Sequence, residues 1–91
     1  MTPFDKKSEY SNARRQQLEE RMLILHNDEI NTFDHVIDTL QEVCSHDKVQ
    51  AEQCAVITHF KGFCEIKRGV LPELEQLQQA LNNKELKVTI N

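Results

Sequence analysis

The most regular feature of the chain is an alternation of short apolar segments with polar breaks. The first apolar run is Met22–Leu25, and the polar residues 26–29, with the sequence His-Asn-Asp-Glu, follow it. A short apolar run ended by turn-forming residues is typical of a buried strand. We therefore predict a strand over residues 21–26 and a polar loop after it.

Three later segments carry apolar residues at the spacing of an α-helix. The first begins near Phe33, the second covers residues 48–60, and the third begins at Pro72, a residue type favoured in the first helical turn. The first helix has its apolar face at Phe33, Val36, Ile37, Leu40, Val43 and Cys44, and the third at Leu71, Leu74, Leu77 and Leu81. The second helix has apolar residues on most of its sides, which predicts that it is well buried.

Candidate capping residues stand at the ends of these helices. Asn31 or Thr32 precedes the first helix, and Ser45 or Asp47 precedes the second. Each of these side chains can accept a hydrogen bond from the first helical turn. Gly62 follows the second helix, at a position where a left-handed residue often ends a helix. The helix boundaries are therefore predicted from local chemistry as well as from periodicity.

Two further strands complete the predicted elements. Residues 63–67 form the second strand, and residues 67–69, Lys-Arg-Gly, are interpreted as its turn. Residues 86–90 alternate between apolar and polar side chains, which is typical of a half-buried strand. The order β-α-α-β-α-β predicts an α+β fold, with a small three-stranded antiparallel sheet and the helices packed on one face.

The length of 91 residues suits a single domain with room for one shallow site. Residues 1–20 are polar, with scattered charges and no sustained apolar face. We expect residues 1–20 to form a flexible N-terminal arm and residues 21–91 to form the domain. The sequence leaves open whether the arm is only a mobile extension or docks onto a partner.

Charge and cysteine content argue against several classes of protein. The net charge is −4, and it falls on residues 21–91 because the charges of residues 1–20 cancel. A mildly acidic domain repels phosphate groups, so no nucleic-acid partner is expected. An odd number of cysteines, three, and the lack of a secretory signal favour reduced thiols and a cytoplasmic location. No apolar run reaches the ~20 residues of a membrane-spanning helix, so no membrane association is expected.

The polar loop is the best candidate for chemistry. Asn27 and Asp28 offer acceptors and Glu29 adds negative charge, so the loop suits a cationic or hydrogen-bond-donating ligand. No local signature of a nucleophile, a phosphate loop, or a zinc or calcium site is present, and we expect neither enzyme activity nor a metal or cofactor. His59 near the end of the second helix is open to two interpretations, a helix-capping histidine or a third group facing the loop.

Several short motifs, in their order along the chain, resemble the ClpS family, whose members are adaptors of bacterial Clp proteases. The family pattern is Asn-Asp and an acidic residue, then a large apolar residue, then a helix with Val and Leu on one face, and much later His-x-x-Gly. The matching residues are Asn27, Asp28, Glu29, Phe33, Val36, Leu40, His59 and Gly62. The resemblance covers the chain from about Leu23 to the C-terminus.

The resemblance implies a domain that recognises N-terminal degradation signals, called N-degrons, which typically begin with Phe, Leu, Tyr or Trp. It implies that Asn27, Asp28 and His59 face the free α-amino group of the substrate. The residues implied around an apolar pocket for the side chain are Asn31, Thr32, Phe33, Val36, Ala55, Thr58 and Leu86. The implied partner is a Clp-family AAA+ unfoldase of the ClpA or ClpC kind. The implied fold is similar to the C-terminal domain of ribosomal protein L7/L12.

The chain departs from the common family pattern in four places. Asn31-Thr32 stands where Thr-Pro is usual, and Phe33 where Met is frequent. Ala55 and Thr58 replace bulkier apolar residues, and the strand after residue 62 lacks a Cys-Gly pair. These departures bear on side-chain preference more than on the amine site. An alternative therefore stays open, a ClpS-like peptide-binding module with altered specificity that does not depend on an N-degron.

Overall fold

The computed structural model describes residues 19–91, which form three strands and three helices in the order β-α-α-β-α-β. The elements are β1 (Glu20–His26), α2 (Phe33–Cys44), α3 (Lys48–Lys61), β2 (Phe63–Val70), α4 (Leu71–Asn83) and β3 (Lys87–Ile90). The predicted α+β order is therefore confirmed. The predicted N-terminal arm lies outside the described residues except for its last two, of which Glu20 already belongs to β1.

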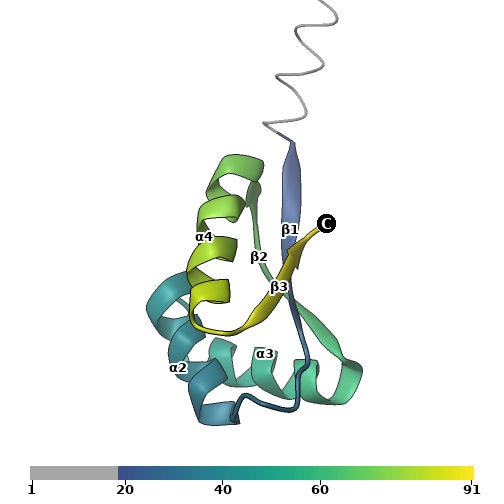
Figure 1. Ribbon diagram of the computed structural model, residues 1–91, viewed down its shortest axis with the longest axis vertical. Helices are drawn as coiled ribbons and strands as arrows, with labels where there is room; N and C mark the ends of the chain where they lie inside the picture. The colour runs from purple at the N-terminus through teal and green to yellow at the C-terminus, as the bar shows by residue number, and fades with distance from the viewer. Residues whose placement is uncertain (1–18) are drawn as a thin grey trace, which may run out of the picture.

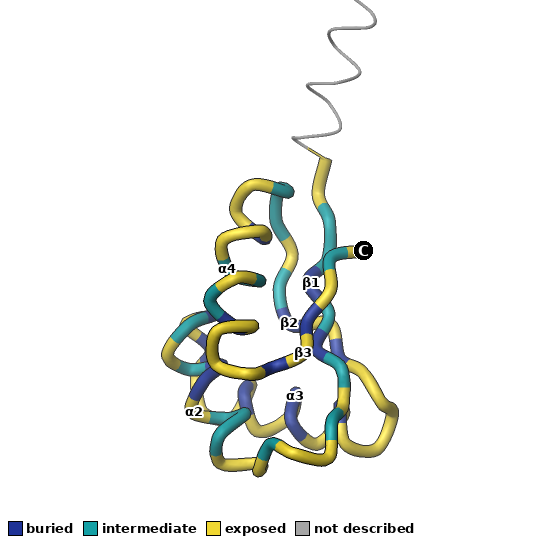
Figure 2. The backbone as a smooth tube through the Cα atoms, in the orientation of Figure 1, coloured by how far each residue is buried: buried dark blue, intermediate teal, exposed yellow. Residues whose placement is uncertain are grey.

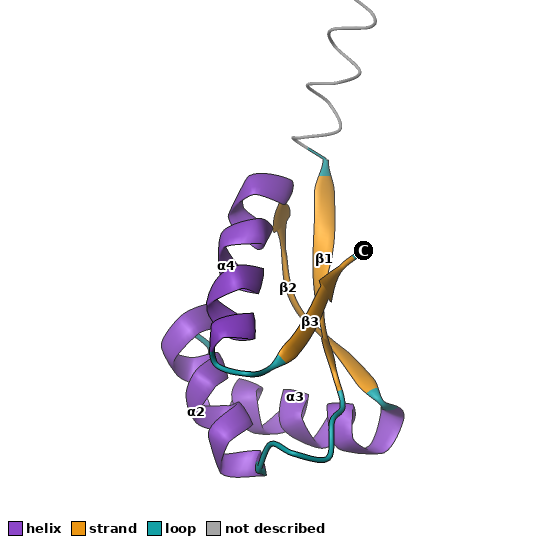
Figure 3. Ribbon diagram, in the orientation of Figure 1, coloured by secondary structure: helices purple, strands orange, loops and turns teal. Residues whose placement is uncertain are grey.

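The central strand of the sheet is β1, which pairs antiparallel with β2 on one side and with β3 on the other. Its side chains alternate in exposure, because Leu23 and Leu25 are buried while Ile24 and His26 are only partly buried. Figure 1 shows α4 lying along the sheet, and α2 and α3 packed at the end where β1 finishes and β2 begins. In Figure 3, α4 lies beside the strands, while α2 and α3 lie below their lower end.

The hydrophobic core fills the space between the strands and the helices. Its most completely buried large side chains are Leu23, Leu25, Leu40, Leu74 and Leu81, which come from β1, α2 and α4. Figure 2 shows the buried stretches on the sides of these elements that face one another. Full burial of a leucine contributes roughly 1.5–3 kcal/mol, so a core made of leucines from three elements holds those elements together.

All three cysteines are free and buried in the core. Their burial shows that they act as small apolar packing residues. Burial, together with the adjacent Cys54 thiol, raises the pKa of the Cys64 thiol to about 12. Because the thiolate is the reactive form, a thiol with a raised pKa is a poor nucleophile.

The helices α2 and α3 have the predicted caps. Thr32 Oγ1 accepts a hydrogen bond from the His35 N–H at 3.1 Å and so begins α2. Asp47 accepts one from the Gln50 N–H at 2.8 Å and begins α3. Gly62 ends α3 in the left-handed conformation, with φ of 94°. These caps determine where the loop after β1 joins α2 and where α3 turns back into the sheet.

The turn predicted at residues 67–69 is wrong, because β2 continues through these residues to Val70. The extension pairs with the start of β1, whose first residue Glu20 lies opposite Val70. The guanidinium of Arg68 forms one ion pair with Glu65 of the same strand and another with Glu20 of β1. A polar Lys-Arg-Gly run is compatible with a strand here because these side chains lie at the edge of the sheet, in contact with solvent.

The prediction that the second helix is well buried is also wrong. The side of α3 that faces the sheet is buried, but four of its apolar side chains are exposed, namely Val49, Val56, Ile57 and Phe60. They are exposed because within residues 19–91 the sheet and α2 cover only one side of α3, and no described element packs against its outer side.

Candidate functional site

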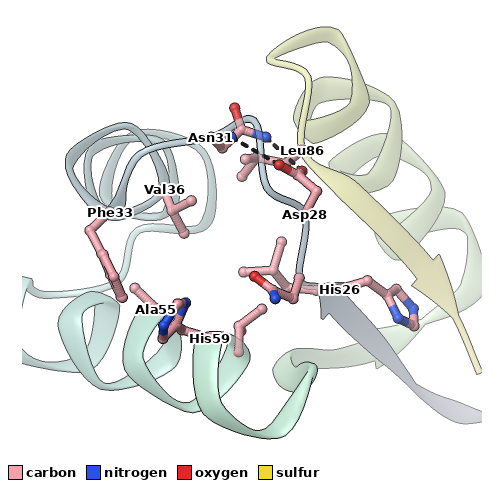
Figure 4. A pocket seen from close by; sticks show the side chains of 11 residues that line it. His26, Asp28, Asn31, Phe33, Val36, Ala55, His59 and Leu86 are labelled. Atoms are coloured by element: carbon pink, nitrogen blue, oxygen red, sulfur yellow. Dashed lines mark hydrogen bonds between the residues drawn. The ribbon is translucent and has the colours of Figure 1, made fainter.

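A small pocket lies at the end of the sheet where the three strands meet. His26, the last residue of β1, pairs there with both Phe63 of β2 and Lys87 of β3. The pocket has a volume of about 50 Å³ and opens between this end of the sheet, the start of α2 and the end of α3 (Figure 4). Its lining residues are Leu25, His26, Asn27, Asp28, Asn31, Phe33, Val36, Ala55, Thr58, His59 and Leu86.

The walls of the pocket are mainly apolar. Val36 comes from α2, Ala55 from α3 and Leu86 from the segment before β3, and Ala55 and Leu86 are buried. The hydroxyl of Thr58 donates a hydrogen bond to the Cys54 carbonyl at 2.7 Å, so this polar atom is already paired within α3. The inner part of the pocket therefore suits an apolar group.

The carboxylate of Asp28 organises the loop on one side of the mouth. Its Oδ1 accepts hydrogen bonds from the backbone N–H groups of Ile30 and Asn31, each at 2.9 Å. Its Oδ2 accepts one from the Asn31 side-chain amide at 2.7 Å. A carboxylate offers about four lone-pair sites, so these three bonds leave roughly one for a donor outside the loop.

The charge on Asp28 is retained despite partial burial. Burial raises the pKa of this carboxyl group, but the hydrogen bonds from Asn31 and Ile30 and the positive charge of Lys87 outweigh that effect. The pKa is therefore lowered from its ordinary value of 3.8. A carboxyl group with a lowered pKa is ionised at neutral pH, so the pocket mouth carries a negative charge at this pH.

Asn31 links the loop to the far side of the pocket. Its side-chain amide donates to Asp28 and also to the backbone carbonyl of Glu85 at 2.9 Å. One turn into α2, the His35 ring Nε2 donates to the neighbouring carbonyl of Lys84 at 2.8 Å. These two bonds hold the turn before β3 against α2, and so position Leu86 in the pocket wall.

Asn27 and His59 approach the mouth from two different elements. The backbone N–H of Asn27 donates to the Gly62 carbonyl at 2.9 Å, which fixes the end of β1 beside the end of α3. The His59 ring lies against Phe33, with 5.2 Å between ring centroids (Figure 4). Within residues 19–91 the C-terminal cap of α3 is Gly62, and His59 lines the pocket instead. This geometry favours the second interpretation of His59, as a group that faces the loop.

The structure brings nine of the ten predicted site residues around this pocket, and the exception is Thr32. Thr32 caps α2 through its hydroxyl and does not line the pocket. Two lining residues were not predicted, Leu25 and His26. The imidazole of His26 points away from the pocket and bonds Thr89 Oγ1 at 2.7 Å (Figure 4). Strand alternation before Asn27 is the signal that would have indicated Leu25, because it places that side chain on the core face.

The fold and the pocket together define a small α+β domain with one apolar binding pocket and polar groups at its mouth. The chain matches the family described as ATP-dependent Clp protease adaptor protein ClpS over residues 16–89. Because this match covers most of the chain, the chain belongs to the ClpS family. The resemblance drawn from the sequence motifs is therefore confirmed.

A solved structure shows the same fold. The structure of Agrobacterium tumefaciens ClpS2 bound to L-phenylalaninamide aligns with a TM-score of 0.74 and 18% sequence identity. The alignment covers 80% of this chain and 95% of that chain. A search of curated proteins found no match. At this identity the structural similarity establishes the fold, while the family match establishes membership.

The family is one of protease adaptors rather than of proteases. Among the described residues, no group of three His, Cys, Asp or Glu side chains is placed to hold a metal ion. None of the helices in the described part of the chain is both long enough and apolar enough to cross a membrane.

Proposed function

We propose that this protein is an adaptor that binds substrates through a free N-terminal residue with a bulky apolar side chain and delivers them to a Clp unfoldase. The observation that carries the proposal is the pocket, in which apolar walls lie below a mouth lined by hydrogen-bond acceptors. A side chain would enter between Val36, Ala55 and Leu86. The α-ammonium group would stay at the mouth.

The residues at the mouth match the chemistry of an α-ammonium group. This cation has three N–H donors and needs acceptors. The Asn27 side-chain oxygen, the remaining acceptor site of Asp28 and a ring nitrogen of neutral His59 can supply them. Asp28 also supplies the opposite charge. An acetylated N-terminus has no charge and one donor, so it would leave these acceptors without partners.

The expected affinity follows from these contacts. A hydrogen bond to a charged group contributes roughly 1.5–3 kcal/mol, and the burial of one large apolar side chain contributes about as much. Two or three such bonds and one filled pocket, less the cost of association, correspond to dissociation constants near the micromolar range.

Binding of an aromatic side chain requires the pocket to widen. The volume of about 50 Å³ is smaller than the ~150 Å³ of a cavity that accepts benzene. Phe33 forms part of the rim and is 43% exposed, so its ring can turn toward solvent without disrupting the core. We therefore propose that the Phe33 ring turns to widen the pocket. Phe33 occupies the position where relatives frequently have Met.

The Agrobacterium tumefaciens relative supports the proposal, because its structure holds L-phenylalaninamide, a compound with a free α-amine and a benzyl side chain. The family description supports a Clp protease as the recipient of the bound substrate. We extend this to an unfoldase of the ClpA or ClpC kind and to a cytoplasmic location. In this role the protein binds and transfers its substrate and performs no chemistry on it.

The direct test is a titration with short peptides that begin with Phe, Leu, Tyr, Trp, Ile or Ala, each with a free and an acetylated N-terminus. Fluorescence anisotropy should show tight binding of the free peptides with bulky apolar first residues and weak binding of the Ala peptide. Acetylation should cost ~2–5 kcal/mol, because the acceptors that the bound peptide covers at the mouth lose their charged partner.

Delivery to the protease is tested with a reporter protein that begins with Phe, prepared with a free and with an acetylated N-terminus. Each form is incubated with a Clp unfoldase and its peptidase. Addition of the adaptor should accelerate degradation of the free Phe reporter only. If acetylation leaves the binding of the Phe peptide unchanged, the N-degron function is wrong. The alternative of a peptide-binding module with a different specificity would then hold.

A further inference from the structure

One side of α3 presents a row of exposed residues to solvent. Val49, Gln53, Val56 and Phe60 recur at intervals of four, three and four residues, which places them on one face of the helix. We call this row the α3 ridge. Its three apolar members are 64%, 46% and 81% exposed in chain order. The buried residues of α3 lie on the opposite side and are Ala51, Cys54, Ala55 and Thr58. Exposed contiguous apolar surface is typical of an interaction site.

The α3 ridge is continuous with the candidate pocket. The rings of Phe60 and His59 lie edge to face, with 5.0 Å between their centroids. The His59 ring in turn contacts Phe33 at 5.2 Å, and both His59 and Phe33 line the pocket. Three rings therefore connect the pocket mouth with the end of the ridge.

The dimensions of the ridge suit an extended peptide. From Phe60 back to Val49 the helix advances by about 16 Å at ~1.5 Å per residue. An extended chain advances ~3.3 Å per residue, so about five residues would cover the ridge. A substrate whose first residue occupied the pocket would therefore have its next five residues available for contact with α3.

We infer that the α3 ridge binds the second and following residues of the substrate when these are apolar. This inference rests on the proposed function, because the first residue in the pocket brings the rest of the chain to Phe60. The ridge has no charged member, and its one polar residue is the uncharged Gln53. It therefore discriminates by apolar area, so an apolar segment gains affinity and a polar segment does not. The continuity with the pocket favours a substrate segment over a second copy of the chain or another protein.

The test compares three ligands by calorimetry: phenylalaninamide, a Phe-initial hexapeptide with apolar residues at positions 2–6, and a Phe-initial hexapeptide with Ser and Gly at these positions. The apolar hexapeptide should bind the wild-type protein about tenfold more tightly than the polar one. The double variant Val49→Ser/Val56→Ser should lose this gain and keep its affinity for phenylalaninamide, because neither residue lines the pocket.

Phe63→Ser is the matched control. Phe63 is 50% exposed, close to the 46% of Val56, but it belongs to β2 and lies on the face of the sheet opposite the buried Cys64, so it lines neither the pocket nor the ridge. This variant should keep the tenfold gain, and the thermal midpoints of all variants should show that they are folded.

Three results would overturn the inference. The first is equal affinity of the wild-type protein for the two hexapeptides, and the second is a gain that survives in the double variant. The third is a wild-type dimer, seen by analytical ultracentrifugation and lost in the double variant, because it would assign the ridge to a second copy. If phenylalaninamide itself fails to bind, the proposed function fails, and this outcome is distinct from a missing gain with the hexapeptide.

Discussion

Asp28 combines a structural role with the role proposed for it in binding. Its carboxylate accepts two backbone and one side-chain hydrogen bond within the loop, and its remaining acceptor site lies at the mouth of the pocket. The loop residues that would bind the amine therefore depend on Asp28 for their own conformation. A substitution at this position should affect stability and binding together.

Asp28→Ala should lower the free energy of unfolding by ~1–3 kcal/mol, because two backbone N–H groups lose their acceptor. Asp28→Asn keeps an oxygen for those N–H groups and should cost less, about 1 kcal/mol. Both variants should weaken phenylalaninamide binding at least about tenfold, because both remove the negative charge. Urea denaturation and calorimetry measure the two effects. Unchanged stability in Asp28→Ala would show that the loop bonds contribute nothing, and unchanged affinity would remove Asp28 from the amine site.

The pH dependence of stability gives a check on the charge itself. Because the native pKa of Asp28 is lowered, its contribution is fully present above the ordinary value of 3.8 and is lost as the pH falls through the native pKa. The difference in unfolding free energy between the wild type and Asp28→Asn should therefore be largest near neutral pH and shrink below about pH 4. If the difference in unfolding free energy stayed constant with pH, the ionised form of Asp28 would contribute no more to stability than the protonated form.

Some residues of the candidate site could be predicted from the sequence pattern, and others could not. Asn27 and Asp28 stand out because polar acceptors directly follow an apolar strand. Ala55, Thr58 and Leu86 carry no such signal, and only the family resemblance placed them at the pocket. The structural role of Asn31 could not be predicted at all, because its bond to the Glu85 carbonyl joins positions 54 residues apart.

Among the elements, α3 ends at a residue whose backbone conformation also positions the candidate site. Gly62 has φ of 94°, and a Cβ at this position would have nothing within 4 Å. Gly62→Ala should therefore destabilise the protein by ~1–2 kcal/mol through backbone strain alone, and not through a clash. Thermal or urea denaturation measures the loss. Because the Gly62 carbonyl accepts the bond from Asn27, phenylalaninamide binding should also weaken.

Gly69→Ala is the control for this substitution, since the chain has two glycines. Gly69 does not have a positive φ, and an added Cβ would lie 3.3 Å from the Glu73 carboxylate, the flexible end of a side chain. Its effect should stay within ~0.5 kcal/mol. Equal losses at the two glycines would contradict the assignment of strain to Gly62.

The helices could be predicted from the sequence more fully than the sheet. Periodic apolar faces and caps at Thr32, Asp47 and Gly62 are local signals, and the structure has them where they were expected. The extension of β2 to Val70 depends on pairing with β1, which is distant in the chain, so residues 67–69 resembled a turn. The exposed side of α3 was missed because apolar residues around a helix usually mean burial, whereas here the described elements cover only one side.

At the scale of the whole molecule, the fold collects three distant segments at one end of the sheet. The loop after β1 together with the start of α2, the second half of α3 and the turn before β3 each contribute to the pocket. The leucine core lies behind them and contributes Leu25 to the lining. This separation allows the mouth to carry polar groups and a charge while the core keeps its packing. It also means that a ligand in the pocket should affect all three segments and little else.

Chemical-shift mapping of the isotope-labelled protein can show whether this pocket binds a free N-terminal residue. Saturating phenylalaninamide should shift the backbone amide signals of Asp28, Val36, Ala55, His59 and Leu86, which represent the three segments. N-acetylphenylalaninamide at the same concentration should leave them almost unchanged. Shifts located away from the pocket, or equal shifts with the acetylated compound, would mean that this pocket does not bind a free N-terminal residue.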